Sequence, residues 1–266
     1  MILCVDIGNT NITCAIGSSE SFIHASVFSS RVEDRNDFLH FLDERFEEHM
    51  IKQLCGCIIS SVIPEKTKII IEAVKALGSA PPNVPQISDS SHEQAEGKIH
   101  VRLIDKDALG VDFSGYNGRL GDDRVVCCEA LATKYQAPII LIDFGTATTI
   151  NVVDEDNCFL GGAILPGVLT GLDALSSRTA QLPLVSDFSN VRLIGSDTAQ
   201  CLVSGAIIGT ACMIDGYVDR IDSILTDEPT IVITGGNSAK IAPHLSFSFI
   251  YEPSLILEGL FLIYEQ

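Results

Sequence analysis

The 266-residue sequence has few basic residues: 17 lysines and arginines stand against 35 aspartates and glutamates, which gives a formal net charge of −18. Phosphate backbones and anionic lipids attract basic faces, so this balance argues against nucleic acid or an anionic membrane as a partner. No uninterrupted apolar run approaches the roughly 18 residues of a membrane-spanning helix. An anionic nucleotide remains compatible with the charge, because local backbone N–H groups and a bridging cation can hold its phosphates.

The nine cysteines lack the spacings of a metal site or a disulfide framework. There is no C-x-x-C pair; Cys55 and Cys57 alternate on an expected strand, and Cys127 and Cys128 lie on an expected helix. No cationic segment precedes the apolar start, which Asp6 interrupts, so we expect no signal peptide. These features predict reduced, mostly buried thiols in a cytoplasmic protein. A redox sensor is the alternative, and it would need an exposed thiol of low pKa.

Two widespread catalytic motifs are also missing. Neither G-x-S-x-G nor the Walker A pattern occurs, which argues against the α/β-hydrolase and P-loop classes. None of the six histidines falls in a metal or triad pattern. A hydrophobic fraction of 46% and the absence of low-complexity tracts predict a compact fold with a large core, in one or two domains.

What the sequence does contain is one strand-turn-strand pattern in two copies. The first copy is the strand Ile2–Val5, the turn DIGNT and the strand Asn11–Ile16, with a third strand expected at Phe22–Phe28. The second copy is the strand Pro138–Ile142, the turn DFGTATT and the strand Ile150–Val153, with a third strand around Cys158–Ile164. Two copies of one supersecondary signal predict two related α/β halves, residues 1–118 and 119–266, which face each other across a cleft.

Other elements follow from periodicity and from start signals. Expected helices are Arg35–Met50, a segment that starts at Pro64, Asp122–Tyr135, Asp197–Leu225 and Pro253–Tyr264. Expected strands are Cys57–Pro64 and Ile231–Asn237. Gly161–Gly167 and Ser176–Pro183 are expected to form turns around a helix, and Ala80–Glu96 is the most loop-like stretch.

The two turns have the composition of phosphate-binding loops. Glycine allows a close approach of the backbone and a positive φ, so that consecutive N–H groups can point at an oxyanion. Additional side-chain donors are Asn9, Thr10, Thr146 and Thr148. Asp6 and Asp143 would repel phosphate and instead suit a cation, either Mg²⁺ or a monovalent ion. An ordinary hairpin turn, in which the aspartate accepts bonds from its own backbone, is the alternative.

Two further segments suggest a site. Asp122 and Asp123 begin an expected helix, where a carboxylate also favours the positive end of the helix dipole. Next to Arg124, Asp123 suits the role of orienting an alcohol and accepting its proton during phosphoryl transfer. The segment Thr234–Asn237 (TGGN) follows an apolar strand, and its paired glycines would let a nucleobase or ribose lie against the chain. Arg178 either clamps an anion or pairs at the surface.

Together these segments resemble the type III pantothenate kinase family. The matching segments, in order along nearly the whole chain, are DIGNTN at 6–11, GDDR at 121–124, DFGTATTI at 143–150, GGAILPG at 161–167, SRTAQLP at 177–183 and TGG at 234–236. The resemblance implies the acetate and sugar kinase, Hsp70 and actin superfamily, whose duplicated halves are ribonuclease-H-like. It implies that ATP phosphorylates the primary hydroxyl of pantothenate to give 4'-phosphopantothenate, the first step of coenzyme A biosynthesis. It also implies Mg²⁺, a monovalent cation (K⁺ or NH₄⁺) and a homodimer.

The resemblance assigns roles to individual residues. The first phosphate loop would consist of Asp6, Ile7, Gly8, Asn9, Thr10, Asn11, Ile12 and Thr13, with Asp6 holding Mg²⁺ directly or through water. The substrate loop would consist of Gly121, Asp122, Asp123 and Arg124, with Asp123 as the base. Asp143 would hold the monovalent cation, Thr146 would contact the nucleotide, and Thr179 would contact pantothenate.

Two departures from the family pattern bear on function. Asp122 stands where the family has a small or apolar residue, and the family's substrate-contacting tyrosine corresponds to Tyr116 in a shorter segment. These departures keep one alternative open, a non-catalytic regulator of the same fold that binds nucleotide or pantothenate. The joint presence of Asp6, Asp123 and Asp143 favours a kinase. Another small-molecule kinase or phosphatase of the superfamily is less favoured, because GDDR and SRTA resemble the pantothenate kinases.

Overall fold

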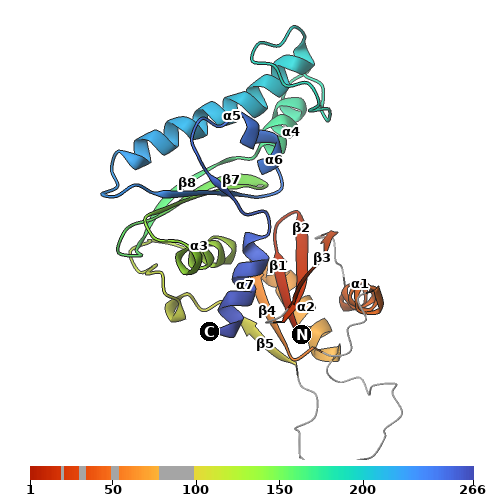
Figure 1. Ribbon diagram of the computed structural model, residues 1–266. Helices are drawn as coiled ribbons and strands as arrows, with labels where there is room; N and C mark the ends of the chain where they lie inside the picture. Colours follow the sequence, from red (N-terminus) through yellow and green to blue (C-terminus); the bar gives the residue numbers. More distant parts are fainter. Residues whose placement is uncertain (19–20, 30–33, 49–53, 78–98) are drawn as a thin grey trace, which may run out of the picture. The chain divides into compact units, whose positions relative to one another are not determined.

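The computed structural model describes residues 1–18, 21–29, 34–48, 54–77 and 99–266, which form two compact α/β units (Figure 1). Unit 1 comprises Met1–Asp105, Gly121–Val126 and Ile256–Gln266. Unit 2 comprises Lys106–Leu120 and Cys127–Leu255. The predicted halves, residues 1–118 and 119–266, describe the sequence repeat, and their boundary stays a prediction. The expected loop Ala80–Glu96 lies outside the described residues.

Unit 1 contains a five-stranded sheet in the order β3-β2-β1-β4-β5. Its strands are β1 (Ile2–Ile7), β2 (Asn11–Ser18), β3 (Ser21–Ser29), β4 (Gly56–Ser61) and β5 (His100–Leu103). The first three strands are antiparallel neighbours, whereas β4 and β5 run parallel to β1. The three predicted N-terminal strands are therefore confirmed. β4 ends at Ser61, before the expected Pro64, because proline cannot donate to a ladder and instead begins a helix.

Helices α1 (Arg35–Glu48) and α2 (Pro64–Leu77) contribute to the core of unit 1. Leu3, Val5 and Ile7 lie on one face of β1, because side chains alternate along a strand. They pack with Phe38 of α1 and Ile70 of α2, and all five side chains are fully buried.

Helix α7 (Leu255–Glu265) also contributes to unit 1, from Ile256 onward. Arg102 Nη1 donates a 2.7 Å hydrogen bond to the carbonyl oxygen of Ile263. The Tyr264 ring lies over Gly56 of β4, where a Cβ atom would overlap the phenol hydroxyl. The end of the chain is thus fastened to the parallel side of the first sheet.

Unit 2 contains a second five-stranded sheet, in the order β10-β9-β6-β7-β8. Its strands are β6 (Ile139–Phe144), β7 (Ala147–Val153), β8 (Phe159–Pro166), β9 (Thr230–Thr234) and β10 (Ile250–Tyr251). In both sheets the first strand is central, the second and third follow antiparallel, and the fourth and fifth lie parallel on its other side. The predicted duplication is therefore confirmed.

The prediction that Gly161–Gly167 forms a turn is wrong for most of the segment, because residues up to Pro166 belong to β8. Gly162 pairs with Asn151, and a Cβ atom there would overlap the carbonyl group of Ile150. Gly161 and Gly162 have φ values of 110° and 153°. Gly162 serves a close approach between β7 and β8, and glycine in a strand often has this purpose. Gly161 makes no such approach, and its positive φ is what favours glycine there.

The helices of unit 2 are the C-terminal part of α3 (Asp122–Lys134), α4 (Val168–Arg178), α5 (Thr198–Asp222) and the short α6 (Ser238–Ile241). Two 3₁₀ turns, Lys106–Ala108 and Ala242–His244, complete the unit. Asp197 begins α5 as predicted, and its Oδ1 accepts a 2.8 Å hydrogen bond from the backbone N–H of Gln200. The expected turn at Ser176–Pro183 begins only after Arg178, because the first three residues complete α4.

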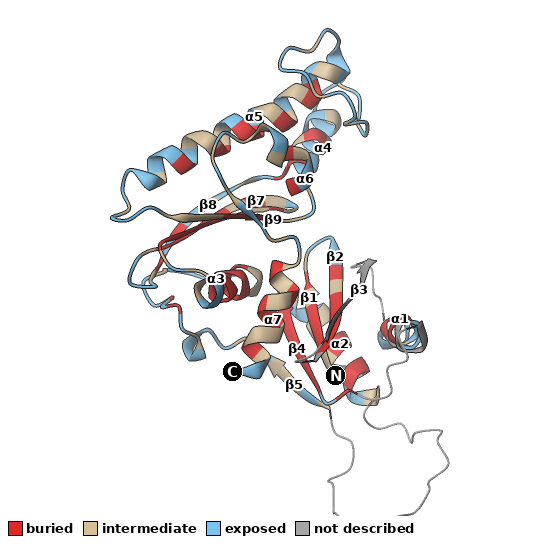
Figure 2. Ribbon diagram, in the orientation of Figure 1, coloured by how far each residue is buried: buried red, intermediate tan, exposed pale blue. Residues whose placement is uncertain are grey.

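Helix α5 packs against the sheet with one side only. Ile207 and Ile214 are fully buried and share a core with Ile142 and Phe144 of β6. Figure 2 shows buried, half-buried and exposed residues alternating along this helix. Among the described residues α5 alone is long and apolar enough to cross a membrane, with 33% of its apolar window buried. Because its buried side chains belong to a protein core, this length and composition are weak evidence for a membrane span.

All nine cysteines are free thiols, and five of them are buried. Burial raises the pKa of Cys4 to about 12 and raises the pKa of Cys57 well above its ordinary value. The exposed cysteines are Cys55, Cys201 and Cys212. The expectation of mostly buried thiols is confirmed.

Candidate functional site

The first turn presents polar side chains at the end of two buried strands. Ile7 and Ile12 pair across β1 and β2 and are fully buried, so they fix both ends of the turn. The turn is closed by a 2.9 Å hydrogen bond from the Gly8 N–H to the carbonyl oxygen of Asn11. Between them Asn9 and Thr10 are exposed, as a loop that binds a ligand requires.

Asp6 is held at the end of β1 by the parallel neighbouring strand. It pairs in register with Ser60 of β4, and the Ser60 hydroxyl donates a 2.9 Å hydrogen bond to Asp6 Oδ1. Ser60 is fully buried, whereas Asp6 is half-buried. The carboxylate is therefore oriented from the interior while part of it remains accessible.

The second turn is one residue shorter than the first. Phe144 pairs with Thr148 across β6 and β7, and the Gly145 N–H donates a 3.1 Å hydrogen bond to the carbonyl oxygen of Ala147. The carbonyl oxygen of Thr146 accepts hydrogen bonds from the Thr170 hydroxyl, at 2.7 Å, and from the Gly167 N–H, at 3.1 Å. The backbone of Thr146 is thus fastened to the start of α4, while its side chain is exposed.

Two details of the predicted turns are corrected. Positive φ among the described glycines occurs at Gly118, Gly161, Gly162 and Gly235, and hence at neither Gly8 nor Gly145. The turn glycines instead serve close contact: a Cβ atom on Gly8 would lie 3.2 Å from the carbonyl oxygen of Asn11. Thr148 is fully buried, and its hydroxyl has no partner within the described parts of the chain, so it is no donor at the surface of the turn.

Asp143 lies against the segment Thr234–Asn237. It pairs in register with Thr234, and the next residue, Gly235, has φ of 94°. A Cβ atom on Gly235 would overlap Asp143 Oδ1, so only glycine lets the backbone lie on this carboxylate. The Asn237 N–H donates a 3.0 Å hydrogen bond to the carbonyl oxygen of Phe144. The TGGN segment therefore contacts the second turn within unit 2.

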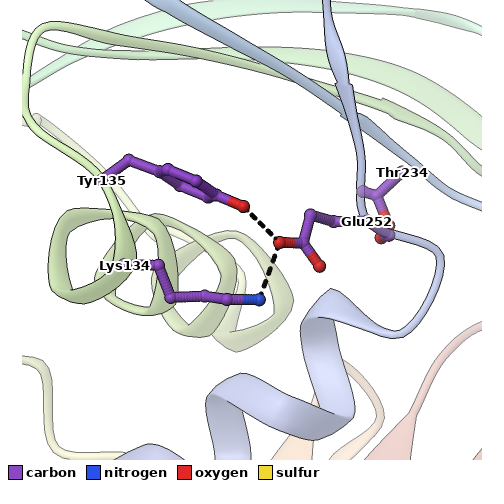
Figure 3. A network of polar contacts seen from close by, with 4 residues as sticks. All are labelled: Lys134, Tyr135, Thr234 and Glu252. Atoms are coloured by element: carbon purple, nitrogen blue, oxygen red, sulfur yellow. Dashed lines mark hydrogen bonds and ion pairs between the residues drawn. The ribbon is translucent and has the colours of Figure 1, made fainter.

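A polar network lies behind this segment (Figure 3). The Thr234 hydroxyl donates a 2.7 Å hydrogen bond to the carbonyl oxygen of Glu252, whose Oε1 accepts from Lys134 Nζ at 2.7 Å and from the Tyr135 hydroxyl at 2.5 Å. Burial raises the pKa of the Glu252 carboxyl, but hydrogen bonds from Lys134 and Tyr135 outweigh it, and the pKa is lowered. No sequence motif indicated Lys134, Tyr135 or Glu252.

The segment Gly121–Arg124 forms the start of α3 in unit 1. Asp123 Oδ1 accepts a 2.9 Å hydrogen bond from the Arg124 N–H, and a Cβ atom on Gly121 would overlap the same carboxylate oxygen. Asp122 Oδ2 accepts a 3.3 Å hydrogen bond from the Ser61 N–H. Ser61 follows Ser60, which bonds Asp6, so the end of β4 brings the first turn and the start of α3 together. Arg124 is only 9% exposed.

Tyr116 is placed by aromatic packing. Its ring meets that of Phe159 edge to face at 5.4 Å, and a Cβ atom on Gly161 would lie 3.8 Å from it. The segment that carries Tyr116 is fixed by Glu129 of α3, whose Oε2 accepts 3.0 Å hydrogen bonds from the Gly110 and Val111 N–H groups. Glu129 is buried, and sequence reasoning missed it.

Thr179 ends α4, and its side chain is exposed. Its hydroxyl donates a 2.8 Å hydrogen bond to the carbonyl oxygen of Leu175 and accepts a 3.3 Å bond from the Leu182 N–H. The hydroxyl therefore shapes the end of the helix, and a substrate contact there would add to this local role.

The carboxylates next to the two turns fit a cation that a bound nucleotide would also help to hold. Within the described ranges, no group of three or more His, Cys, Asp or Glu side chains gathers as a metal site. Mg²⁺ in kinase sites is usually bound by one or two carboxylates, waters and substrate phosphates, for which the half-buried Asp6 beside exposed hydroxyl and amide groups suffices. Because Gly235 has no side chain, its backbone lies directly beside the Asp143 carboxylate.

Comparisons with known proteins show which family the chain is similar to. The sequence model of the type III pantothenate kinase family matches residues 2–220. A type III pantothenate kinase from Moorella thermoacetica is 31% identical over 270 residues, covering 100% of this chain and 99% of that protein. One from Persephonella marina is 32% identical over 268 residues, covering 99% and 98%.

Solved structures give the fold. A Campylobacter jejuni protein described as a Baf family transcriptional activator has a TM-score of 0.59 at 19% identity, covering 99% of this chain and 97% of that one. A Sinorhizobium meliloti protein described as a 2-dehydro-3-deoxygalactonokinase has a TM-score of 0.56 at 12% identity, covering 100% and 96%. At these identities the likenesses concern the fold alone, and with the two matching sheets they support the expected actin-like ATPase fold.

Proposed function

Because this chain belongs to the type III pantothenate kinase family, we propose that its two turns and the start of α3 carry out that family's reaction. The enzyme uses ATP, with Mg²⁺, to phosphorylate pantothenate in coenzyme A biosynthesis. One observation carries the residue assignment: the adjacent Ser60 and Ser61 bond Asp6 and Asp122, so the GDDR segment lies beside the first turn in unit 1.

In the proposed reaction Asp123 orients the primary hydroxyl of pantothenate and accepts its proton. The hydroxyl oxygen forms a bond to the γ-phosphorus while the bond to the bridging oxygen breaks, and ADP leaves. Such transition states are loose, so positioning and electrostatics contribute more than the base does. The other proposed substrate contacts are Gly121, Asp122, Arg124, Tyr116 and Thr179. Asp122 in addition supports the start of α3 through its bond to Ser61.

For the nucleotide, we propose that Asp6–Thr13 and Thr146 bind the phosphates and that Thr234–Asn237 borders the nucleoside. The exposed Asn9 and Thr10 side chains and backbone N–H groups supply the donors. Mg²⁺, held by Asp6 directly or through water, reduces the charge repulsion among the phosphates when bound. In this proposal residues 1–118 and 119–266 are the two copies of the duplicated half, and each contributes one turn.

We propose that Asp143 binds a monovalent cation, K⁺ or NH₄⁺. Its carboxylate stands where Gly235 has no side chain, and backbone of the second turn and of the TGGN segment surrounds it. Carboxylate and carbonyl oxygens are the ligands that hard cations prefer. Such an ion offsets negative charge next to the nucleotide in a protein with a net charge of −18.

We also propose a cytoplasmic homodimer that binds neither nucleic acid nor a membrane. Support for the dimer comes from α4 and α5, whose outer surface forms a groove of 410 Å³. Leu175, which is 45% exposed, and Gly205 line this groove, and Gly209 follows Gly205 about one helical turn along α5. A Cβ atom on either glycine would meet no atom within 4 Å, which leaves open space for close packing. Sedimentation equilibrium would test the dimer, and Gly209→Glu, which places a charge on this surface, should favour the monomer.

A coupled ADP-release assay tests the function itself. Purified chain with Mg²⁺, K⁺ and ATP should release ADP only when pantothenate is added, and mass spectrometry should find 4'-phosphopantothenate in equal amount. Pantothenate without its primary hydroxyl should give no turnover, because the attacking oxygen is missing. A folded chain that binds ATP and pantothenate without turnover would favour the regulator over the kinase.

A further inference from the structure

The segment Thr234–Asn237 has a solvent side and an interior side. On the solvent side, Gly236 is exposed, and a Cβ atom there would meet no atom within 4 Å. On the interior side, Thr234 is 6% exposed and bonds the backbone of Glu252. A ligand would therefore meet the glycines from one side, while Glu252 holds the segment from the other.

We infer that Glu252 is a positioning residue for nucleotide binding: anchored by Lys134 and Tyr135, it holds Thr234–Asn237 against the second turn. The inference rests on the proposed function, in which this segment borders the nucleoside. Glu252 itself touches no substrate in this arrangement. It acts through the backbone that it fixes.

Glu252 is tied to the segment by its own backbone. Its N–H donates a 3.0 Å hydrogen bond to the carbonyl oxygen of Ile233, and its carbonyl oxygen accepts the 2.7 Å bond from the Thr234 hydroxyl. Two bonds to consecutive residues fix both the position and the direction of the chain where β9 ends. A displacement of Glu252 would therefore also shift Thr234 and the adjacent Gly235.

The side chain of Glu252 provides the anchor (Figure 3). Lys134 Nζ lies 2.7 Å from Glu252 Oε1, and the side chains of Glu252 and Lys134 are 15% and 27% exposed. The Tyr135 hydroxyl donates to the same oxygen. Two hydrogen bonds to one partly buried carboxylate oxygen, one of them charge-assisted on the donor side, are stronger than a single surface ion pair, so this anchor resists displacement. Lys134 and Tyr135 stand at the C-terminal end of α3, a regular helix and hence a rigid support.

On its other end the segment is fixed without Glu252. The fully buried Ser238 donates to the carbonyl oxygen of Gly235, and its hydroxyl lies 3.2 Å from that of Tyr251. Asn237 bonds the second turn at Phe144. Loss of the Glu252 anchor is therefore expected to loosen Thr234 and Gly235 without unfolding the unit. A loosened segment must be ordered when the nucleotide binds, which weakens binding.

The test compares Glu252→Ala with a matched control, Glu155→Ala. Glu155 also accepts a hydroxyl bond, from Thr226, but it follows β7, whose end pairs with the start of β6. It therefore lies at the opposite end of the sheet from Thr234, which pairs with the end of β6. The full-length variants are titrated with Mg-ATP in a calorimeter and assayed with ATP and pantothenate varied in turn.

Glu252→Ala should weaken ATP binding about five- to tenfold and raise the KM for ATP equally, the size expected from loss of one charge-assisted anchor. The KM for pantothenate and kcat should stay within about twofold, and Glu252→Gln, which still accepts the Tyr135 hydroxyl, should restore part of the affinity. Glu155→Ala should match the wild type. Equal changes in both KM values, or a lower unfolding midpoint with unchanged ATP affinity, would overturn the inference.

If Glu252→Ala does not fold, Tyr135→Phe and Lys134→Met each remove one bond of the anchor and should each weaken ATP binding about two- to threefold. Unchanged affinity in both would overturn the inference. Gly236→Val separates the inference from the site assignment, because its side chain enters open space on the solvent side. Weaker ATP binding in Gly236→Val with normal binding in the Glu252 variants would refute only the role of Glu252. Normal binding in all of them would refute the assignment of the segment as well.

Discussion

The two sheets place a hydroxyl at the same position and use it differently. Ser60 on β4 pairs with Asp6, and Thr234 on β9 pairs with Asp143, each in the parallel register next to the aspartate that precedes a turn. The Ser60 hydroxyl donates to the carboxylate of Asp6, whereas the Thr234 hydroxyl donates to the backbone of Glu252. Beside Asp143 the neighbour is instead the backbone of Gly235.

This difference shows which parts of a duplicated fold are free to change. Sheet order and register are shared, because they are set by backbone hydrogen bonds and by buried apolar faces. The hydrogen-bond partner of each aspartate depends on one side chain and on the next glycine. Two acids at equivalent positions can therefore have different neighbours without any change in the sheets.

The helix that follows the fifth strand differs more strongly between the copies. After the fifth strand of the first sheet this helix is α3, whose first turn carries Asp122, Asp123 and Arg124. After the fifth strand of the second sheet it is α7, which begins with Leu255, Ile256 and Leu257. The proposed base thus has no counterpart at the start of α7, so in the proposed reaction only α3 provides the acid-base chemistry.

The largest effect is expected from removing the carboxylate of Asp123, which distinguishes the start of α3 from that of α7. Asp123→Asn should lower kcat about 100-fold or more and leave ATP affinity unchanged, because the amide cannot accept the hydroxyl proton. Steady-state kinetics and calorimetry measure the two quantities. Glu258→Gln, a carboxylate in the first turn of α7, is the matched control and should keep the wild-type kcat. Near-normal turnover in Asp123→Asn would remove Asp123 from the role of base.

The next effect separates the two turn aspartates. Asp143→Asn should abolish the difference between activity in K⁺ and in Na⁺, whereas Asp6→Asn should keep that difference and require more Mg²⁺. Each should lower kcat/KM about 10- to 100-fold, because an ion that offsets transition-state charge is lost or misplaced. Activity is measured over a matrix of both cations. The same cation response in both variants would contradict distinct roles for the two acids.

A smaller effect is expected for the equivalent hydroxyls of Ser60 and Thr234, and it appears in the free energy of unfolding. Ser60→Ala removes a buried donor to a carboxylate and should lower the free energy of unfolding by about 1.5–3 kcal/mol. Thr234→Val removes a donor to a carbonyl group and should cost about 1 kcal/mol. Urea unfolding of both variants measures these values. The comparison fails if Thr234→Val costs as much as Ser60→Ala.

The smallest effect is a pH dependence in unit 2. The folded-state pKa of Glu252 is lowered, so the stability that its carboxylate provides is present above the ordinary glutamate pKa of about 4.3 and is lost as pH falls through the lowered value. The stability difference between wild type and Glu252→Gln should therefore be constant from neutral pH to about pH 5 and shrink below it. If the stability difference instead grew on acidification, the folded-state pKa of Glu252 would be raised and the prediction would be wrong. Urea unfolding at stepped pH measures it.

Much of this arrangement was predictable because it is local in sequence. Apolar runs and helical periods gave the strands around both turns and helix α3 to within a few residues, and the repeat gave the duplication. The prediction for the GGAILPG segment was wrong because paired glycines favour a turn locally, yet here both lie in β8 and Gly162 allows close contact with β7. Periodicity does not distinguish the two uses of glycine.

The supporting residues of the site were not predictable, because their partners are distant in sequence. Glu252 accepts from Lys134, 118 residues away, and Asp122 accepts from Ser61, 61 residues away. Glu129 looks like any acidic residue of a helix until the fold brings the Gly110 and Val111 N–H groups to it. Motifs identify residues that meet a ligand, whereas residues that hold those motifs in place become visible only in three dimensions.

The distribution of the thiols has a practical consequence. Maleimides and iodoacetamides react with thiolates, and burial keeps Cys4, Cys14 and Cys57 protonated at neutral pH because it raises the pKa of each. Cys55 in unit 1 and Cys201 and Cys212 on α5 are exposed. In a single chain, a fluorescent or spin label would therefore enter at these few surface positions, none of which belongs to the two turns. Cys201 also lines the groove between α4 and α5, so dimer formation through that groove would protect it from the label.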